Sequence, residues 1–253
     1  METKEKVFTY GAIFLLFAAI IAVGTVAALR DKDKVITELK ITGADLLNTD
    51  DYLEFTGFTS NKSFENLKLS VIKARFDSHP YIKYADVKRN ADNSVSVEIT
   101  EKTVLAQIIN DKSLYLVTDK RELLKLLNGT TRVDYPVISN LPDSILTTRD
   151  TIKFEKELKL AVNIVNAIKT AGESKIKLAE VDLRKGNEII VHLENIAAFV
   201  KFGRGNYSAK IVSLVNAVLN ERTKSRIDNA LYVDVRYSNR IYIGNYEENK
   251  VAI

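Results

Sequence analysis

The chain has 253 residues, of which 46% are hydrophobic and 28% charged, and its 37 basic and 33 acidic residues give a formal net charge of +4. This balance is typical of a folded protein, and the net charge is too small to indicate nucleic-acid binding. The absence of cysteine excludes disulfides, thiol catalysis and cysteine-bound zinc.

An uncharged segment from Val7 to Leu29 is the most apolar part of the sequence. At about 1.5 Å per helical residue it is long enough to cross a hydrocarbon layer of roughly 30 Å. It is also longer than the 7–15 apolar residues that are usual in a cleaved signal peptide. We therefore expect residues 1–6 to form a short cytoplasmic tail and residues 7–29 a transmembrane helix. Basic residues flank the segment on both sides, so charge alone does not fix its orientation.

Residues 35–101 predict a compact strand–helix–helix–strand–strand unit. The first strand covers 35–41, and a short helix over 50–55 has Thr49 as its N-cap and Gly57 as its end. Ser63 is expected to cap the second helix, which stops before Pro80. The apolar face expected for this helix carries Phe64, Leu67, Val71 and Ala74. Strands at 82–89 and 94–101 follow, joined by a turn at 90–93.

The remaining sequence predicts a mixed α/β region with a largely antiparallel sheet. Helices are expected at about 152–171 and 207–221. The expected strands are at 104–109, 113–117, 177–183, 188–193 and 197–202, followed by a terminal hairpin of 232–237 and 240–243.

No segment predicts an enzyme site. His79 precedes a proline and His192 lies in a strand, and neither has companions at metal-ligand or triad spacing. Gly203-Arg204-Gly205 lies between a strand and a helix but lacks the third glycine of a dinucleotide loop, which favours a tight turn. The pairs Asp50-Asp51 and Glu180/Asp182 are interpreted as a helix start and a solvated strand face. We expect no catalytic, cofactor-binding or metal-binding residue.

The terminal hairpin offers a possible binding surface. Residues 240–243 would be the last strand, and an unpaired strand edge presents amide and carbonyl groups that another chain can complete. The alternative is an edge blunted by Arg240 and by the acidic Glu247-Glu248. The pattern alone leaves both interpretations open.

The order of elements resembles known families. Pro80-x-Ile82-x-x-Ala85-x-Val87 and Val97-x-Ile99-x-Glu101, within the βααββ order, resemble a POTRA domain over 35–102. The succession as a whole resembles the FtsQ/DivIB cell-division proteins, through Glu101-Lys102-x-x-x-Ala106, Val200-Lys201-Phe202-Gly203 with Lys210, and Tyr232-Val233-Asp234-Val235-Arg236-Tyr237. The resemblance implies an α+β protein with a single N-terminal transmembrane helix, the POTRA domain, a β domain over 103–246 and a tail over 247–253.

The resemblance also implies a function. It suggests a non-enzymatic divisome scaffold of the cytoplasmic membrane, enriched at the septum, with its domains on the outer side and no nucleic acid or small-molecule substrate. Its partners would be FtsB and FtsL, which it would link to the septal peptidoglycan synthase machinery (FtsW/FtsI). The residues expected to receive an FtsB strand are Arg236, Tyr237, Arg240, Ile241, Tyr242 and Ile243. Two alternatives remain: a POTRA-containing accessory of outer-membrane protein assembly or secretion, and a membrane-tethered enzyme.

Overall fold

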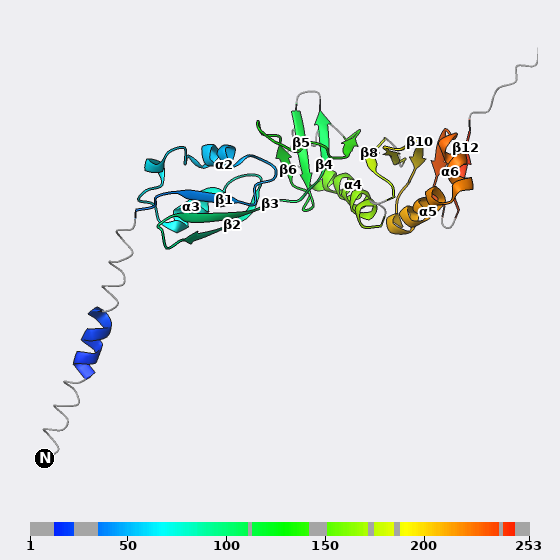
Figure 1. Ribbon diagram of the computed structural model, residues 1–253. Coiled ribbons are helices and arrows are strands. Elements are labelled where there is room, and N and C mark those ends of the chain that lie inside the picture. Colours follow the sequence, from blue (N-terminus) through cyan, green and yellow to red (C-terminus); the bar gives the residue numbers. More distant parts are fainter. Residues whose placement is uncertain are drawn as a thin grey trace, which may run out of the picture. The chain divides into compact units, whose positions relative to one another are not determined.

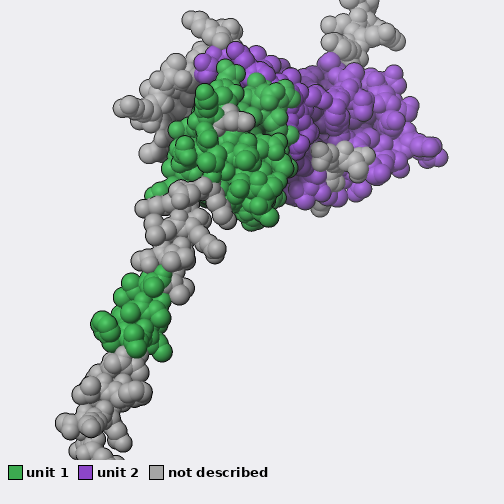
Figure 2. Space-filling view, turned by 60° about the vertical axis from the view of Figure 1, so that its left-hand side comes forward, with its two compact units in different colours: residues 1–44, 48–101 green, residues 45–47, 102–253 purple. Residues whose placement is uncertain are grey.

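A computed structural model gives the fold of the chain (Figure 1). It describes residues 13–22, 35–110, 113–141, 151–171, 175–184, 188–237 and 240–245. The described chain divides into two compact units, which Figure 2 shows in green and purple. Unit 1 contains residues 48–101 and the chain before residue 45, and unit 2 contains residues 45–47 and the chain from Lys102 onward.

The predicted membrane anchor is only partly covered. Residues 13–22 are helical and expose apolar side chains such as Phe14 and Leu16. The rest of the segment from Val7 to Leu29 lies outside the described residues. Within the described ranges, no helix combines the length and the apolar character that crossing a bilayer requires. The anchor therefore stays a prediction.

Unit 1 has the predicted βααββ order and a three-stranded sheet, in which β3 lies between β1 and β2. β1 pairs with β3 in parallel, and β2 pairs with β3 in antiparallel orientation. The elements are β1 (Leu39–Thr42), α2 (Thr49–Thr56), the 3-10 turn η1 (Asn61–Ser63), α3 (Leu69–Asp77), β2 (Ile82–Arg89) and β3 (Val95–Glu101).

Alternation along β3 creates the core of this sheet. Val95, Val97 and Ile99 are fully buried, as the period of two predicts, whereas the residues between them face outward. The helices of unit 1 pack around these side chains, with Ile72 and Phe76 of α3 fully buried. Gly57 ends α2 in the left-handed conformation (φ 73°), as the sequence predicts.

The predicted start and face of the second helix were wrong. Ser63 ends η1 rather than capping a helix, and its backbone N–H bonds to the carbonyl of Ser60 at 2.9 Å. Phe64 then packs edge-on against Phe58 before the chain turns into α3. Because α3 begins only at Leu69, its buried face carries Ile72 and Phe76, and Val71 is exposed.

Unit 2 is built on a larger mixed sheet. In its described part the strand order is β12-β11-β10-β9-β8-β7-β4-β5-β6, with parallel pairs at β10–β11, β7–β8 and β4–β7 and antiparallel pairs elsewhere. The strands are β4 (Val104–Asn110), β5 (Ser113–Thr118), β6 (Leu123–Lys125), β7 (Val137–Ser139), β8 (Leu178–Asp182), β9 (Ile190–Leu193), β10 (Ile196–Lys201), β11 (Tyr232–Asp234) and β12 (Tyr242–Gly244). The helices are α4 (Thr151–Ala171), α5 (Tyr207–Leu219) and α6 (Glu221–Asp228).

The helices of unit 2 pack on the sheet and on one another. α4 contacts β4, β8 and α5, and α6 contacts α5 and β10. The apolar faces of α4 and α5 pack into the core, where Leu158, Val165 and Ile168 of α4 and Ile211 and Leu214 of α5 are buried.

Three features of unit 2 differ from the sequence prediction. The helix predicted to 221 ends at Leu219, and α6 follows as a separate helix whose mainly charged sequence buries only Ile227. The short strands β6 and β7 were not predicted. Asp182 does not lie on a solvated strand face: it is buried, accepts a hydrogen bond from the Asn140 amide at 2.6 Å and pairs with Arg184 at 2.6 Å.

Candidate functional site

The last strand of the chain's described part ends the large sheet. β12 pairs with β11 through Tyr232–Gly244, Val233–Ile243 and Asp234–Tyr242, and no strand follows it in the sheet order of the described residues. We use the name hairpin edge for the six residues predicted to bind a partner. They are Arg236, Tyr237, Arg240, Ile241, Tyr242 and Ile243.

The pairing register shows which backbone groups face outward. The Val235 N–H donates to the Lys201 carbonyl at 3.0 Å, and the Leu231 carbonyl accepts from Phe199, so odd-numbered residues of β11 point toward β10. Because backbone groups alternate along a strand, Tyr232 and Asp234 face β12. Tyr242 and Gly244 consequently point back to β11, and the N–H and carbonyl of Ile243 point to the open side.

Two exposed tyrosines of the hairpin edge contact each other. Tyr237 and Tyr242 are 55% and 48% exposed, and their rings meet edge to face with centroids 5.4 Å apart. Ile241 and Ile243 are half-buried against the core of unit 2. The strand thus has an anchored apolar side and an aromatic surface open to solvent, the kind of residue that contributes most to protein interfaces.

Arg236 is held by neighbouring acids. Its guanidinium forms a forked pair with Asp234, at 2.6 and 3.0 Å, and lies 3.9 Å from a carboxylate oxygen of Glu188. The hydrogen bond that the guanidinium donates to Asp234 raises the pKa of Arg236. Burial opposes ionisation of Asp234, but hydrogen bonds from the Arg236 side chain and backbone outweigh it and lower the pKa of this carboxyl. Arg236 is therefore a fixed part of the edge.

Two glycines permit this arrangement. A Cβ atom at Gly203 (φ 61°) would lie 2.9 Å from Cγ of Arg236, and one at Gly244 would lie 2.2 Å from the Tyr232 ring. Tyr232 in turn packs beside Phe199 and carries the Lys201 ammonium 3.9 Å from its ring centre. The sequence signalled Gly203 as a turn residue, but the contacts of both glycines depend on strand pairing and could not be anticipated.

A small cavity adjoins the hairpin edge. It has a volume of about 190 Å³, and Tyr237 and Arg240 line it together with residues at the start of α5. Lys210 forms part of its wall; its ammonium donates to the carbonyls of Phe202 and Arg204, both at 2.9 Å, and burial lowers its pKa. The cavity is large enough for one or two side chains of a partner.

The two histidines and the Gly203–Gly205 loop contribute to packing and to a turn. His79 is buried among Tyr52, Phe55 and Tyr81, and its Nδ1 accepts a hydrogen bond from the Tyr81 backbone N–H at 3.1 Å. His192 is half-buried in β9. Gly203 and Gly205 have positive φ angles in the turn before α5. Among the described residues, no three acidic or histidine side chains are grouped as metal ligands.

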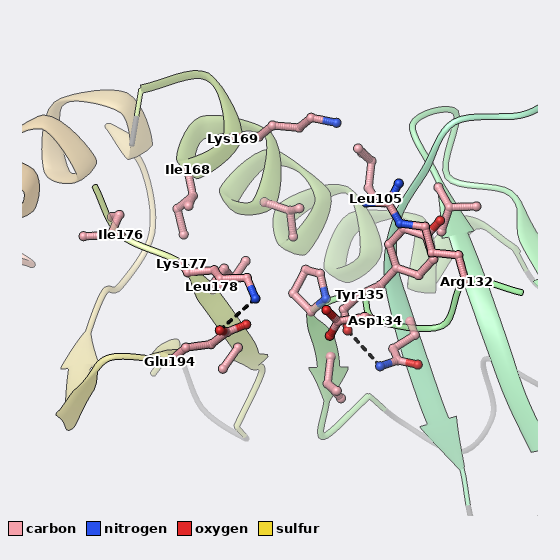
Figure 3. A pocket seen from close by; sticks show the side chains of 16 residues that line it. Leu105, Arg132, Asp134, Tyr135, Ile168, Lys169, Ile176, Lys177, Leu178 and Glu194 are labelled. Atoms are coloured by element: carbon pink, nitrogen blue, oxygen red, sulfur yellow. Dashed lines mark hydrogen bonds and ion pairs between the residues drawn. The ribbon is translucent and has the colours of Figure 1, made fainter. Parts of the chain in front are cut away.

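A second cavity of unit 2 was not predicted from the sequence. It has a volume of about 440 Å³ and lies among β4, β8, the second half of α4 and residues 132–137 (Figure 3). It is separate from the hairpin edge, because β9, β10 and β11 lie between β8 and β12 in the sheet.

Comparison with known proteins gives consistent results. Residues 35–102 match the family model of the FtsQ-type POTRA domain. The chain is 23% identical over 209 residues to the cell division protein FtsQ of Geotalea daltonii, with 82% of this chain and 74% of the relative covered. It is 22% identical to the FtsQ protein of a Geobacter species, covering 81% and 74%, and 20% identical to the cell division protein DivIB of Clostridium acetobutylicum, covering 82% of each chain.

Proposed function

Since the chain belongs to the FtsQ/DivIB family of cell-division proteins, we propose that it is a non-enzymatic scaffold that captures a strand of another division protein on β12. Residues 35–102 are then its POTRA domain and residues 103–246 its β domain. The observation that carries this proposal is the outer edge of β12, which no described strand covers and where the backbone of Ile243 points outward next to the exposed Tyr242.

Strand addition supplies part of the binding free energy. Four to six added backbone hydrogen bonds at about 1 kcal/mol each, with an aromatic anchor at about 2 kcal/mol, contribute about 6–8 kcal/mol before the cost of association. Micromolar binding corresponds to about 8 kcal/mol after that cost, so apolar contacts beside the added strand must supply the remainder. Tyr237 and Tyr242 supply the anchor area. The cavity beside Tyr237 and Arg240 provides room for a partner side chain next to the added strand.

The proposed partner is an FtsB homologue bound to FtsL. Through this pair the protein would connect early division proteins with the septal peptidoglycan synthase machinery, FtsW and FtsI. We propose that residues 7–29 anchor it in the cytoplasmic membrane with its two units on the outer side. Proteolysis of a C-terminal tag in spheroplasts tests this orientation, because a protected tag would place the units in the cytoplasm.

The similarity to cell-division proteins supports this role over the alternatives. The matching POTRA model is of the FtsQ type, and relatives named as division proteins align with most of the chain. An accessory of outer-membrane assembly or secretion therefore becomes the weaker alternative. A membrane-tethered enzyme has no supporting side-chain arrangement among the described residues.

Proline substitution on β12 tests strand capture. Tyr242→Pro would also break the pairing of Tyr242 with Asp234 and would therefore disturb the fold. Ile243→Pro is the better test, because it removes only the outward N–H and an edge strand tolerates proline there. We expect Ile243→Pro to lower the affinity for an FtsB–FtsL complex by more than about 30-fold. Ile243→Val is the matched control, because it keeps the N–H and removes one methylene.

Both variants should be tested as full-length protein in detergent micelles, with thermal unfolding as a check of folding. Retained capture by folded Ile243→Pro would refute strand addition at β12. Equal losses in Ile243→Pro and Ile243→Val would assign the effect to the side chain rather than to the backbone.

A further inference from the structure

The shortness of β7 leaves a gap in the sheet of unit 2. β7 pairs with β4 only at Gln107 and with β8 from Glu180 onward, although β4 begins at Val104 and β8 at Leu178. The Gln107 N–H donates to the carbonyl of Pro136 at 2.9 Å, but Pro136 has no N–H with which to continue the pairing. The first residues of β4 and β8 are thus separated by two strand spacings, roughly 10 Å.

The 440 Å³ cavity occupies this gap, and its volume lies in the usual range for ligand sites. Its floor is apolar. The buried side chains of this floor come from β4, α4 and the start of β8, and they are Leu105, Val165, Ile168, Ile176 and Leu178.

The upper rim of the cavity is cationic. Lys169 on α4 and Arg132 on the opposite wall are directed toward the same part of the cavity (Figure 3). Arg132 lies over the Tyr135 ring at 5.3 Å, and in the described part of the chain neither cation has a salt-bridge partner. Lys177 is different, because it pairs with Glu194 at 2.8 Å. Asp134 is the remaining acid in the lining.

We propose that this gap binds an extended acidic segment of another polypeptide, with an apolar side chain on the floor and a carboxylate between Lys169 and Arg132. An extended chain matches a gap that is one strand wide, and at about 3.3 Å per residue the stretch from Val104 to Gln107 accommodates about three residues. A small anion would leave the apolar floor uncovered, and a purely apolar ligand would make no contact with the exposed cations Lys169 and Arg132.

This site is independent of the proposed capture on β12. Four strand spacings separate β8 from β12, which corresponds to roughly 19 Å along the sheet. A partner could therefore occupy one site while the other remains accessible, and variants of one site should leave the other unchanged.

The test uses fluorescein-labelled, capped pentapeptides of the form Thr-Val-X-Leu-Thr, with X as Glu or Gln, and full-length protein in detergent micelles at low salt. Anisotropy titration should show that the Glu peptide binds about tenfold more tightly than the Gln peptide. The double variant Lys169→Gln/Arg132→Gln should abolish this preference. Lys159→Gln, which changes an exposed lysine on the same helix outside the cavity, should preserve it.

A variant that fills the cavity tests whether the peptides bind there. Ala179→Leu places extra volume in the lining and should weaken both peptides about equally. Absence of binding by either peptide, equal affinity for the two, or an equal effect of Lys159→Gln would overturn the proposal. Displacement of the Glu peptide by acetate at the same concentration would show that the cavity is a simple anion site and would overturn the proposed peptide site.

Discussion

The two units contain edge strands with opposite properties. β2 of unit 1 has eight residues and ends its sheet, but the middle of its outer side is already satisfied. The Ala85 N–H donates to the Asp77 carboxylate at 2.7 Å, and the Ala85 carbonyl accepts from the Lys73 ammonium. These two side chains, which pair with each other at 3.0 Å, come from α3 and cover the edge.

β12 of unit 2 is shorter, with three residues, yet it is the more open edge. Among the described residues, no side chain bonds to the outward groups of Ile243, and exposed tyrosines stand beside it. Two side chains of a helix are thus enough to close a long strand edge. Strand length alone therefore does not show which edge can accept another chain.

A pair of tyrosine substitutions sharpens this comparison with the largest expected effect. Tyr237→Ala should weaken capture of an FtsB–FtsL complex by about 1–3 kcal/mol, because it removes an exposed aromatic anchor. Tyr84→Ala on β2 removes a side chain of similar exposure, 50% against 55%, and should change capture by less than about 0.5 kcal/mol. Calorimetric titration distinguishes them, and equal losses would contradict the difference between the two edges.

Removal of the cover of β2 should have an intermediate effect. Asp77→Ala leaves the buried Ala85 without its hydrogen-bond acceptor, so the free energy of unfolding of unit 1 should fall by about 1–2 kcal/mol in urea denaturation. Asp50→Ala, a change at an exposed acid of α2, provides the control. An unchanged urea midpoint for Asp77→Ala would show that water replaces the carboxylate at this edge with no loss in the free energy of unfolding.

The smallest effect concerns pH. The pKa of Asp234 is lowered below its ordinary value of 3.8, so its pairing with Arg236 contributes stability that is present above this value and is lost as pH falls through the lower folded-state pKa. As the pH falls below about 4, the free energy of unfolding of unit 2 should therefore decrease by less than about 1 kcal/mol through this site. Asp234→Asn should remove it, and a pH profile identical to the unsubstituted protein would show that the pair is not linked to folding.

Regular periodicity made much of the fold predictable. The alternating residues of β3, the apolar face of α4 and the terminal hairpin could be located because each forms a repeating pattern in one segment. α6 was missed because only Ile227 is buried along its charged sequence. Ser63 resembled a helix cap, but the packing of Phe64 on Phe58 places a turn there instead.

The candidate sites were less predictable because they depend on pairing between distant segments. The hairpin edge could be proposed from sequence, but the outward direction of Ile243 follows from the hydrogen bonds between β10 and β11. The cavity at β7 requires Val104–Gln107, Val137 and Leu178 to be neighbours in the sheet. The burial of Asp182 likewise follows from its contact with Asn140, 42 positions earlier in the chain.

Amide hydrogen exchange at Ile243 tests the central claim most directly. In the full-length protein without a partner, its outward N–H should exchange rapidly, whereas the N–H of Ala85 should be protected by Asp77. Addition of an FtsB–FtsL complex should slow exchange at Ile243 by at least about tenfold and leave Ala85 unchanged. Rapid exchange at Ile243 in the saturated complex would contradict strand capture on β12.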